Sequence, residues 1–251
     1  MIARRAIVRE PGSRYSDCLS THPLRHTIDL ARARAQHVAY RKALSELGLE
    51  VIALPRDDDH PDSCFVEDTA VVQNGRALIC RAAKEERRGE EKQIESLLSQ
   101  YMPVKRAVAP GTVEGGDVVH LPDWLISGLT QRTNPEGVSQ MGNWLQVKVD
   151  TVVAPKIMHL KSYVSYLGKG TAIVAEEYEG HHALQGLRLL RVPEDERYAA
   201  NVLAVGDVLV VIEGYPKTRK MLAEAGFETV PLEIGEFPKC DAAITCLSIL
   251  F

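Results

Sequence analysis

The chain has 251 residues, of which 45% are hydrophobic and 25% charged, the usual balance of a globular protein with a sizeable core. Its formal net charge of −4 argues against a nucleic-acid partner, whose phosphates call for a basic face. No apolar run approaches the ~18 residues that span a bilayer, and the charged N-terminal residues precede no apolar stretch of signal-peptide length. These features predict a cytoplasmic protein that contacts neither membrane nor nucleic acid.

The five cysteines stand at positions 18, 64, 80, 240 and 246, without CxxC spacing. Because their number is odd and the predicted compartment is reducing, we expect free thiols. The sequence lacks the glycine-rich patterns of dinucleotide and phosphate loops; the Gly-Gly-Asp at 115–117 fits neither. No spacing of His, Cys and Asp is typical of a structural metal site. We therefore expect neither cofactor nor metal, although Cys246, His159 and Glu114 could capture zinc adventitiously.

Hydrophobic periodicity and turn residues predict the main elements along the chain. Gly48 is a favourable end for a first helix, and Asn74-Gly75 is a strong hairpin signal because both turn positions need positive φ. In chain order, we expect a helix at 28–47, a hairpin at 70–80, a helix at 86–100, a strand at 207–214, a helix at 216–226 and a strand at 243–251.

A short β-rich phrase that ends at or near proline recurs about five times, at Pro55, Pro110, Pro155, Pro193 and Pro231. The spacings of 55, 45, 38 and 38 residues favour a repeat architecture, a closed ring with strands inside and helices outside. The alternative is a plain α/β sheet, whose units also place loops after strands. Since no linker or low-complexity stretch interrupts the chain, residues 1–251 are expected to form a single domain.

If the strands converge on one axis, the loops that follow the prolines meet at one end of it. These loops carry Asp62, Glu114, His159 and Asn201, and Cys246 lies in the last strand-like segment. Glu114 and His159 each stand four residues after their proline. A carboxylate, an imidazole and a thiol at one axis are the components of a nucleophilic site.

Each of these residues also has a structural interpretation. A thiol in an apolar strand is more often a small buried hydrophobe, and a lone histidine is usually a satisfied core or surface residue. Thr245 and Ser248 interrupt the apolar run around Cys246, and His159 shares its register with Glu114, so we favour the chemical interpretation. The thiolate would need a neighbouring cation, either a protonated histidine or a cationic substrate.

Charged residues near these loops indicate what the substrate carries. Glu67 and Asp68 are adjacent carboxylates, which are either solvated or hold a guanidinium. Arg87 and Arg88 begin a predicted helix, where basic residues oppose the helix dipole, and Arg132 ends a strand-like run. Arginines in such positions suit a substrate carboxylate.

Six segments together resemble the dimethylarginine dimethylaminohydrolase family of the guanidino-group-modifying (pentein) superfamily, in order along essentially the whole chain. They are HPDSCFVEDTAVV, the Arg87-Arg88 pair, VEGGDVVHLPDWLISGLTQRTNPEG, HLKSYVSYL, YAANVL and ITCLSILF. The resemblance implies a five-bladed, pseudo-symmetric α/β propeller. It also implies hydrolysis of Nω-methylated arginine to citrulline and a methylamine through a covalent thiouronium on cysteine.

By position, the resemblance implies Cys246 as the nucleophile, His159 as general acid and base, and Glu114 as the residue that orients both histidine and guanidinium. It places Glu67 and Asp68 among the carboxylates that contact substrate, Asp68 on the guanidinium itself.

For the amino-acid end of the substrate, the resemblance implies Asp62 at the α-amino group and Arg87 with Arg132 at the α-carboxylate. Leu19 matches a lid-loop position that contacts substrate through its backbone. Cys240 matches a position that is usually aliphatic in the family, so the sequence predicts a second thiol near the pocket.

Three alternatives stay open at this level. An arginine deiminase resembles longer chains with an inserted helical module, and agmatine lacks the carboxylate that Arg87 and Arg132 would hold. A non-catalytic binding propeller is the third, against which the thiol, imidazole and carboxylate argue together. The expected partner is a small arginine-like molecule, and the resemblance implies a homodimer.

Overall fold

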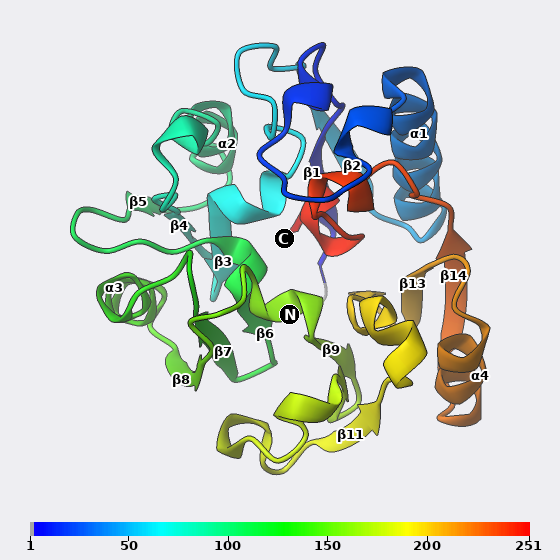
Figure 1. The fold of residues 1–251 in the computed structure, drawn as a ribbon. Helices are drawn as coiled ribbons and strands as arrows, with labels where there is room; N and C mark the ends of the chain where they lie inside the picture. Colours follow the sequence, from blue (N-terminus) through cyan, green and yellow to red (C-terminus); the bar gives the residue numbers. More distant parts are fainter. Residues whose placement is uncertain (1–2) are drawn as a thin grey trace.

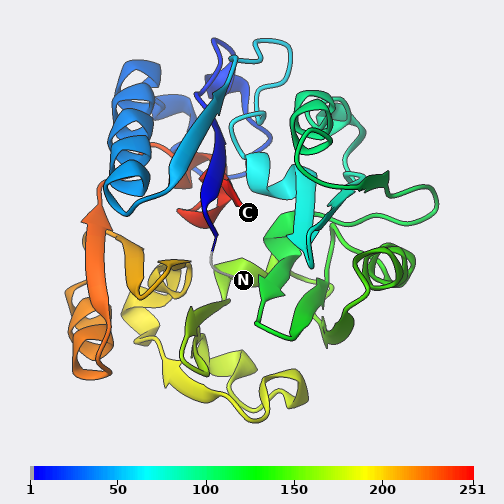
Figure 2. The ribbon, with the colours of Figure 1, turned by 180° about the vertical axis from the view of Figure 1, so that it is seen from behind.

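The computed structural model describes residues 3–251 and contains five three-stranded sheets set around one central axis (Figures 1 and 2). In each sheet the inner strand pairs antiparallel with the middle strand, which pairs parallel with the outer strand. The sheets are separate blades, with no continuous closed barrel among the described residues. This arrangement confirms the five-bladed α/β propeller.

The strands are short, with two to six residues each. From the axis outward, the blades are β15 (Ile249–Leu250), β1 (Arg5–Arg9) and β2 (Glu50–Leu54); β3 (Ala70–Gln73), β4 (Arg76–Ile79) and β5 (Val104–Arg106); β6 (Val118–His120), β7 (Trp124–Leu129) and β8 (Lys148–Val153); β9 (Val164–Gly168), β10 (Thr171–Val174) and β11 (Arg188–Arg191); and β12 (Leu203–Val205), β13 (Val208–Ile212) and β14 (Glu228–Leu232).

The recurring phrase that ends at or near proline corresponds in every case to the outer strand of a blade, so the repeat was correctly identified. A parallel pair requires a crossover, and in four blades this crossover carries an α-helix on the outside of the ring (Figure 1). The helices are α1 (Leu30–Glu46), α2 (Lys92–Leu98), α3 (Pro135–Leu145) and α4 (Pro216–Glu224). The β10–β11 crossover has two short 3₁₀ turns instead, η7 (Glu176–Tyr178) and η8 (His182–Leu184).

The hydrophobic core lies between the blades. Each of five buried apolar clusters joins two neighbouring blades; one, for example, packs Val71 and Leu78 against Val118 and Leu125. The cluster between the last blade and the first also covers the inner face of α1. Since β15 and β1 pair within one sheet, the two ends of the chain close the ring by strand pairing.

Local signals located the first helix and hairpin well. The Asp29 side chain caps α1 by accepting from the amide of Arg32, and Gly48 follows the helix at φ 88°. Asn74 and Gly75 both adopt positive φ between β3 and β4, as the hairpin required.

The helix expected at 86–100 is wrong at its beginning. The segment forms a 3₁₀ turn, η4 (Glu85–Arg87), and α2 begins only at Lys92. Gly89 separates them at φ 121°, a conformation that no helix contains. The turn directs the Arg87 side chain into the molecule, where it is 6% exposed.

The strand expected at 243–251 is also mostly wrong. Cys246 lies in a 3₁₀ turn, η11 (Thr245–Leu247), and only β15 pairs as a strand. The Thr245 hydroxyl donates to a carboxylate oxygen of Glu67, and that side-chain bond stabilises the turn over the extended conformation.

The expectation of free thiols is wrong for two of the five cysteines. Cys18 and Cys240 form a disulfide across 222 residues of sequence, with their Cα atoms 5.9 Å apart. Cys64, Cys80 and Cys246 are free. The ring brings the loop after β1 beside the loop after β14, a proximity that cysteine number and spacing cannot reveal. Within residues 3–251, no helix is long and apolar enough to cross a membrane.

Candidate active site

Five 3₁₀ turns surround one end of the axis, each in the connection that leads into the innermost strand of a blade (Figure 1). In chain order they are η3 (Val66–Thr69), η5 (Gly115–Asp117), η6 (Leu160–Ser162), η9 (Glu194–Ala200) and η11 (Thr245–Leu247). Turn η3 contacts η11 and η5, η5 contacts η6, and η6 contacts η9. Glu114 and His159 each stand directly before their turn, which is the structural cause of their shared register.

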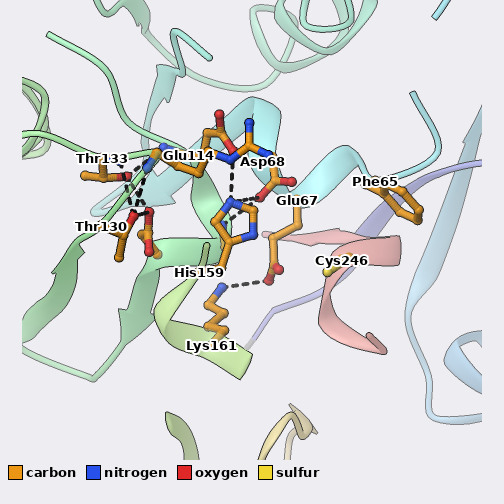
Figure 3. Close-up of polar contacts among 12 residues, drawn as sticks. Phe65, Glu67, Asp68, Glu114, Thr130, Thr133, His159, Lys161 and Cys246 are labelled. Atoms are coloured by element: carbon orange, nitrogen blue, oxygen red, sulfur yellow. Dashed lines mark hydrogen bonds and ion pairs between the residues drawn. The ribbon is translucent and has the colours of Figure 1, made fainter. Parts of the chain in front are cut away.

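His159 is the centre of a buried charge cluster (Figure 3). Its Nε2 lies 2.8 Å from Glu114 Oε2 and 3.6 Å from Asp68 Oδ1. Burial of the imidazole lowers its pKa, but the charge of Asp68 and the hydrogen bond to Glu114 outweigh burial and raise the pKa to about 9. His159 is therefore a protonated imidazolium at neutral pH.

Both glycines of the Gly-Gly-Asp motif are required because neither position has room for a side chain. A Cβ on Gly115 would lie 2.0 Å from the carbonyl oxygen of Glu67, and one on Gly116 would lie 2.7 Å from the His159 ring. The amide of Gly116 donates to Asp68 Oδ1 at 2.9 Å. The glycines thus let the backbone approach site residues closely.

We expect Gly116→Ala to lower activity about 100-fold by displacing the imidazole and Asp68. It should also destabilise the fold by about 1–3 kcal/mol, the usual cost of overpacking. Gly180→Ala is the matched control, because a Cβ there has nothing within 4 Å. Chemical denaturation and steady-state rates of both variants test this expectation, which fails if Gly116→Ala behaves like its control.

Cys246 is the free thiol that solvent can reach. It is half-buried, whereas Cys64 and Cys80 are buried. Its sulfur accepts the amide of Ala243 at 3.5 Å. Burial, then the charges of Glu67 and Asp68, raises its pKa well above the ordinary value. Without a cation nearby, the thiol is therefore protonated; it becomes a thiolate only when a cation approaches.

Glu67 heads a second network that sequence reasoning recognised only in part (Figure 3). One carboxylate oxygen accepts from Lys161 Nζ at 2.7 Å and the other from the Thr245 hydroxyl at 2.8 Å. Asn201 donates to that hydroxyl and accepts the Thr245 amide, both at 3.0 Å. The turn that carries Cys246 is thus fixed by three blades. Lys161 was missed because a lysine beside a histidine carries no distinctive sequence signal.

Asp117 is a further residue that sequence reasoning did not single out. Its carboxylate accepts the hydroxyls of Thr130 and Thr133 and the amide of Leu160 at 2.7, 2.6 and 2.9 Å. Burial outweighs the charge of His159 and these hydrogen bonds, and raises its pKa to about 6. Asp117 therefore joins the loop around Arg132 to the turn after His159. The Gly-Gly-Asp motif was the signal that could have found it.

Three of the residues predicted for the amino-acid end of a substrate, Leu19, Asp62 and Arg87, are linked to one another beside this cluster. Asp62 Oδ1 accepts the Leu19 amide at 3.1 Å, and its Oδ2 lies 3.9 Å from Arg87 Nε. Burial raises the Asp62 pKa, against the lowering effects of Arg87 and Arg132. Arg132 is 6% exposed, and its Nη1 has no hydrogen-bond partner among residues 3–251. A buried guanidinium with an unpaired donor is able to bind an anion.

Arg87 differs from Arg132 because its guanidinium is already paired. Its Nε and Nη2 bind the carboxylate of Glu90, with Nη2 at 2.8 Å, and its Nη1 lies 2.7 Å from Asp68 Oδ2. Nη1 is also 3.8 Å from Glu114 Oε2. The geometry therefore favours Arg132 over Arg87 as the ligand of a carboxylate, and Arg87 as the counter-ion of the carboxylates around His159.

Asp68, Glu114 and His159 offer ligand atoms that all lie within 4.8 Å of one another, a spacing that a metal ion could use. Two positive charges already balance these carboxylates, the Arg87 guanidinium and the protonated His159. The donor set is therefore satisfied by residues of the chain, and it fits an ion-pair cluster better than a metal site.

Propeller and site together place the chain in the pentein superfamily, among the cysteine-dependent enzymes that act on guanidinium groups. Residues 16–181 match the model of eukaryotic N,N dimethylarginine dimethylhydrolase. The chain is 35% identical over 250 residues to the N(G),N(G)-dimethylarginine dimethylaminohydrolase of Pseudomonas aeruginosa, covering 98% of each. It is 38% identical over 258 residues to that of Streptomyces coelicolor, covering 99% of this chain and 97% of the relative.

A solved structure of the P. aeruginosa enzyme, a cysteine-to-serine variant complexed with citrulline, matches with a TM-score of 0.96 and 34% identity, covering 100% of both chains. The chain belongs to the dimethylarginine dimethylaminohydrolase family.

Proposed function

We propose that this chain hydrolyses Nω-methylated arginine to citrulline and a methylamine through a covalent intermediate on Cys246. The observation that carries the proposal is the presence, at one end of the axis, of a half-buried, protonated thiol and an imidazolium held by two carboxylates. Such a site lacks the base that would ionise the thiol, so the substrate itself must supply the activating charge. A planar guanidinium does this, and the relative that binds citrulline holds the expected product.

In the first half-reaction, the guanidinium contacts the carboxylates of Asp68 and Glu114, and its charge lowers the pKa of the adjacent thiol. The thiol loses its proton to solvent, and the thiolate attacks the central guanidinium carbon. His159, protonated beforehand, donates its proton to the departing methylated nitrogen. The amine leaves, and a thiouronium remains on Cys246.

In the second half-reaction, the neutral His159 accepts a proton from water, which attacks the thiouronium carbon. The tetrahedral adduct then collapses: its hydroxyl proton passes to the departing sulfur, and citrulline is released. Glu114 keeps the imidazole oriented throughout, as its 2.8 Å contact indicates. The imidazolium is restored, and Cys246 returns to the protonated thiol that the next cationic substrate will ionise.

At the other end of the substrate, we propose that the free Arg132 donors bind the α-carboxylate and that Asp62 contacts the α-amino group, beside the backbone of Leu19 and Cys240. Glu67, which is paired with Lys161, holds the Cys246 turn through Thr245. Arg87 would join the carboxylate only by leaving Asp68, so we assign it a secondary part. Assembly into a homodimer stays a prediction from the family resemblance.

Replacing Arg132 tests how the amino-acid end of the substrate is bound. We expect Arg132→Gln to raise KM about 10- to 100-fold, because a charge-assisted hydrogen bond to a carboxylate is lost. The same variant should process a guanidine without an α-carboxylate as well as the wild type does. An equal loss for both substrates would assign Arg132 to the fold instead of to the carboxylate.

Citrulline release from asymmetric dimethylarginine, monomethylarginine and arginine tests the function directly. We expect the methylated substrates to be turned over with the higher kcat/KM. A higher value for arginine would support the alternative, a deiminase. Absence of citrulline from all three, with a folded enzyme, would support a binding propeller.

A further inference from the structure

The loop between β1 and α1 crosses the site with little packing of its own (Figure 1). None of residues 19–28, termed here the lid segment, is buried, and Leu19 and Leu24 expose 36% and 51% of their surface. Apart from Ile28, which packs against the core at its C-terminal end, this segment is held by its ends and its polar bonds. The residue directly before the lid segment, Cys18, is fully buried and forms a disulfide with Cys240.

Three hydrogen bonds join the lid segment to the loop that contains Cys240. Ser20 Oγ and the amide of Thr21 donate to Asp241 Oδ2 at 2.7 and 3.2 Å, and Lys239 Nζ donates to the Thr27 carbonyl at 3.0 Å. The Cys18–Cys240 disulfide joins the same two loops covalently. It also fixes the neighbouring Leu19, whose amide binds Asp62 at the amino-acid end of the site.

The turn that carries Cys246 has separate support. Thr245 is bound to Glu67 and Asn201, and neither bond involves the lid segment or Cys240. Breaking the disulfide would therefore loosen the lid segment and leave the thiol and imidazole in place.

We propose that the Cys18–Cys240 disulfide is a positioning element that holds the lid segment over the amino-acid end of the site, so that a dithiol reductant weakens substrate binding. The proposal rests on the proposed function. Reduction breaks the S–S bond and transfers two electrons and two protons from the dithiol, which becomes a cyclic disulfide, to give two thiols. The loosened segment must then be ordered by the substrate, at the expense of affinity.

The first test is the kinetics of Cys18→Ser, Cys240→Ser and the double variant. We expect each to raise KM for asymmetric dimethylarginine about tenfold, with kcat within twofold, because either change removes the whole cross-link. N-butyl-N′,N′-dimethylguanidine, which lacks the amino-acid end, should show an unchanged KM. Dithiothreitol should raise the KM of the wild type and leave that of the double variant unchanged. Unchanged KM in folded variants, or equal rises for both substrates, would overturn the proposal.

The second test needs no turnover. Alkylation of unreduced, denatured wild type should modify three cysteines, and five after dithiothreitol, since Cys64, Cys80 and Cys246 are free. Trypsin should cleave after the exposed Arg25 faster in the double variant than in the wild type. Five reactive cysteines before reduction, or equal cleavage rates, would contradict the proposal even if the enzyme's substrate proves to be different. A wild type that releases no citrulline would overturn the proposed function alone.

Discussion

Cys246→Ser should lower citrulline release by at least about 10⁴-fold, the largest effect of any single substitution in the chain. Serine has nearly the volume of cysteine, but a guanidinium beside it cannot ionise an alcohol at neutral pH. Half-buried Cys246 is, of the three free cysteines, the one that is not buried in the core. Rapid-quench measurement of citrulline decides the outcome.

The control is binding by the same variant. We expect Cys246→Ser to have the same melting temperature as the wild type and to bind citrulline with unchanged affinity, because its turn is held through Thr245. Substantial activity in a correctly folded Cys246→Ser would remove the cysteine from the mechanism.

His159→Asn should lower kcat by about 10²–10⁴-fold, the usual contribution of a positioned proton donor. Asparagine can keep one hydrogen bond to Glu114 but cannot carry a proton to the leaving amine. Substrates with a better leaving group should lose less activity, because they need less protonation. A uniform loss across leaving groups would show that His159 acts on binding instead.

The same variant gives a pH signature in stability. The raised pKa of His159, about 9, means that the folded state binds this proton more tightly than the unfolded chain, whose histidine pKa is about 6.5. The resulting stabilisation, about 3 kcal/mol, is fully present below pH ~6.5 and is lost as the pH rises through about 9.

Chemical denaturation of wild type and His159→Asn between pH 6 and 9.5 measures this linkage. The wild-type free energy of unfolding should fall more steeply over this range, by about 3 kcal/mol relative to the variant. Comparing the two proteins removes the contribution of the buried thiols, which also titrate at high pH. Parallel curves would mean that the Asp68 and Glu114 carboxylates do not hold the imidazole charged.

Sequence predicted the ring because its outer strands are marked by a local and repeated signal, an apolar run closed by proline, as at Pro155 and Pro193. The sequence did not lead us to predict helix α3, although Asn134 and Pro135 form a standard helix start signal. Its polar first turn was assigned instead to the long segment that begins VEGGD and carries part of the family resemblance. Cys246 was placed in a strand because its apolar neighbours favour one. The hydrogen bond from Thr245 to Glu67, 178 residues away in the sequence, favours the 3₁₀ turn over a strand.

The partners of charged groups were the least predictable part of the site. The register of Glu114 and His159 after their prolines predicted that both lie at one end of the axis, where the structure shows them in contact. The pairing of Arg87 with Glu90 and Asp68, and the unpaired donor of Arg132, depend on side-chain directions that no spacing encodes. The Cys18–Cys240 bond likewise depends on closure of the ring.

Mass spectrometry of the quenched wild-type enzyme tests the central claim, attack by Cys246 with loss of the methylated nitrogen. Asymmetric dimethylarginine and arginine should both leave the same thiouronium on the peptide that contains Cys246, because each loses its own amine and retains an unmethylated nitrogen. An adduct that retains both methyl groups, an adduct on another residue, or no adduct during active turnover would contradict this account.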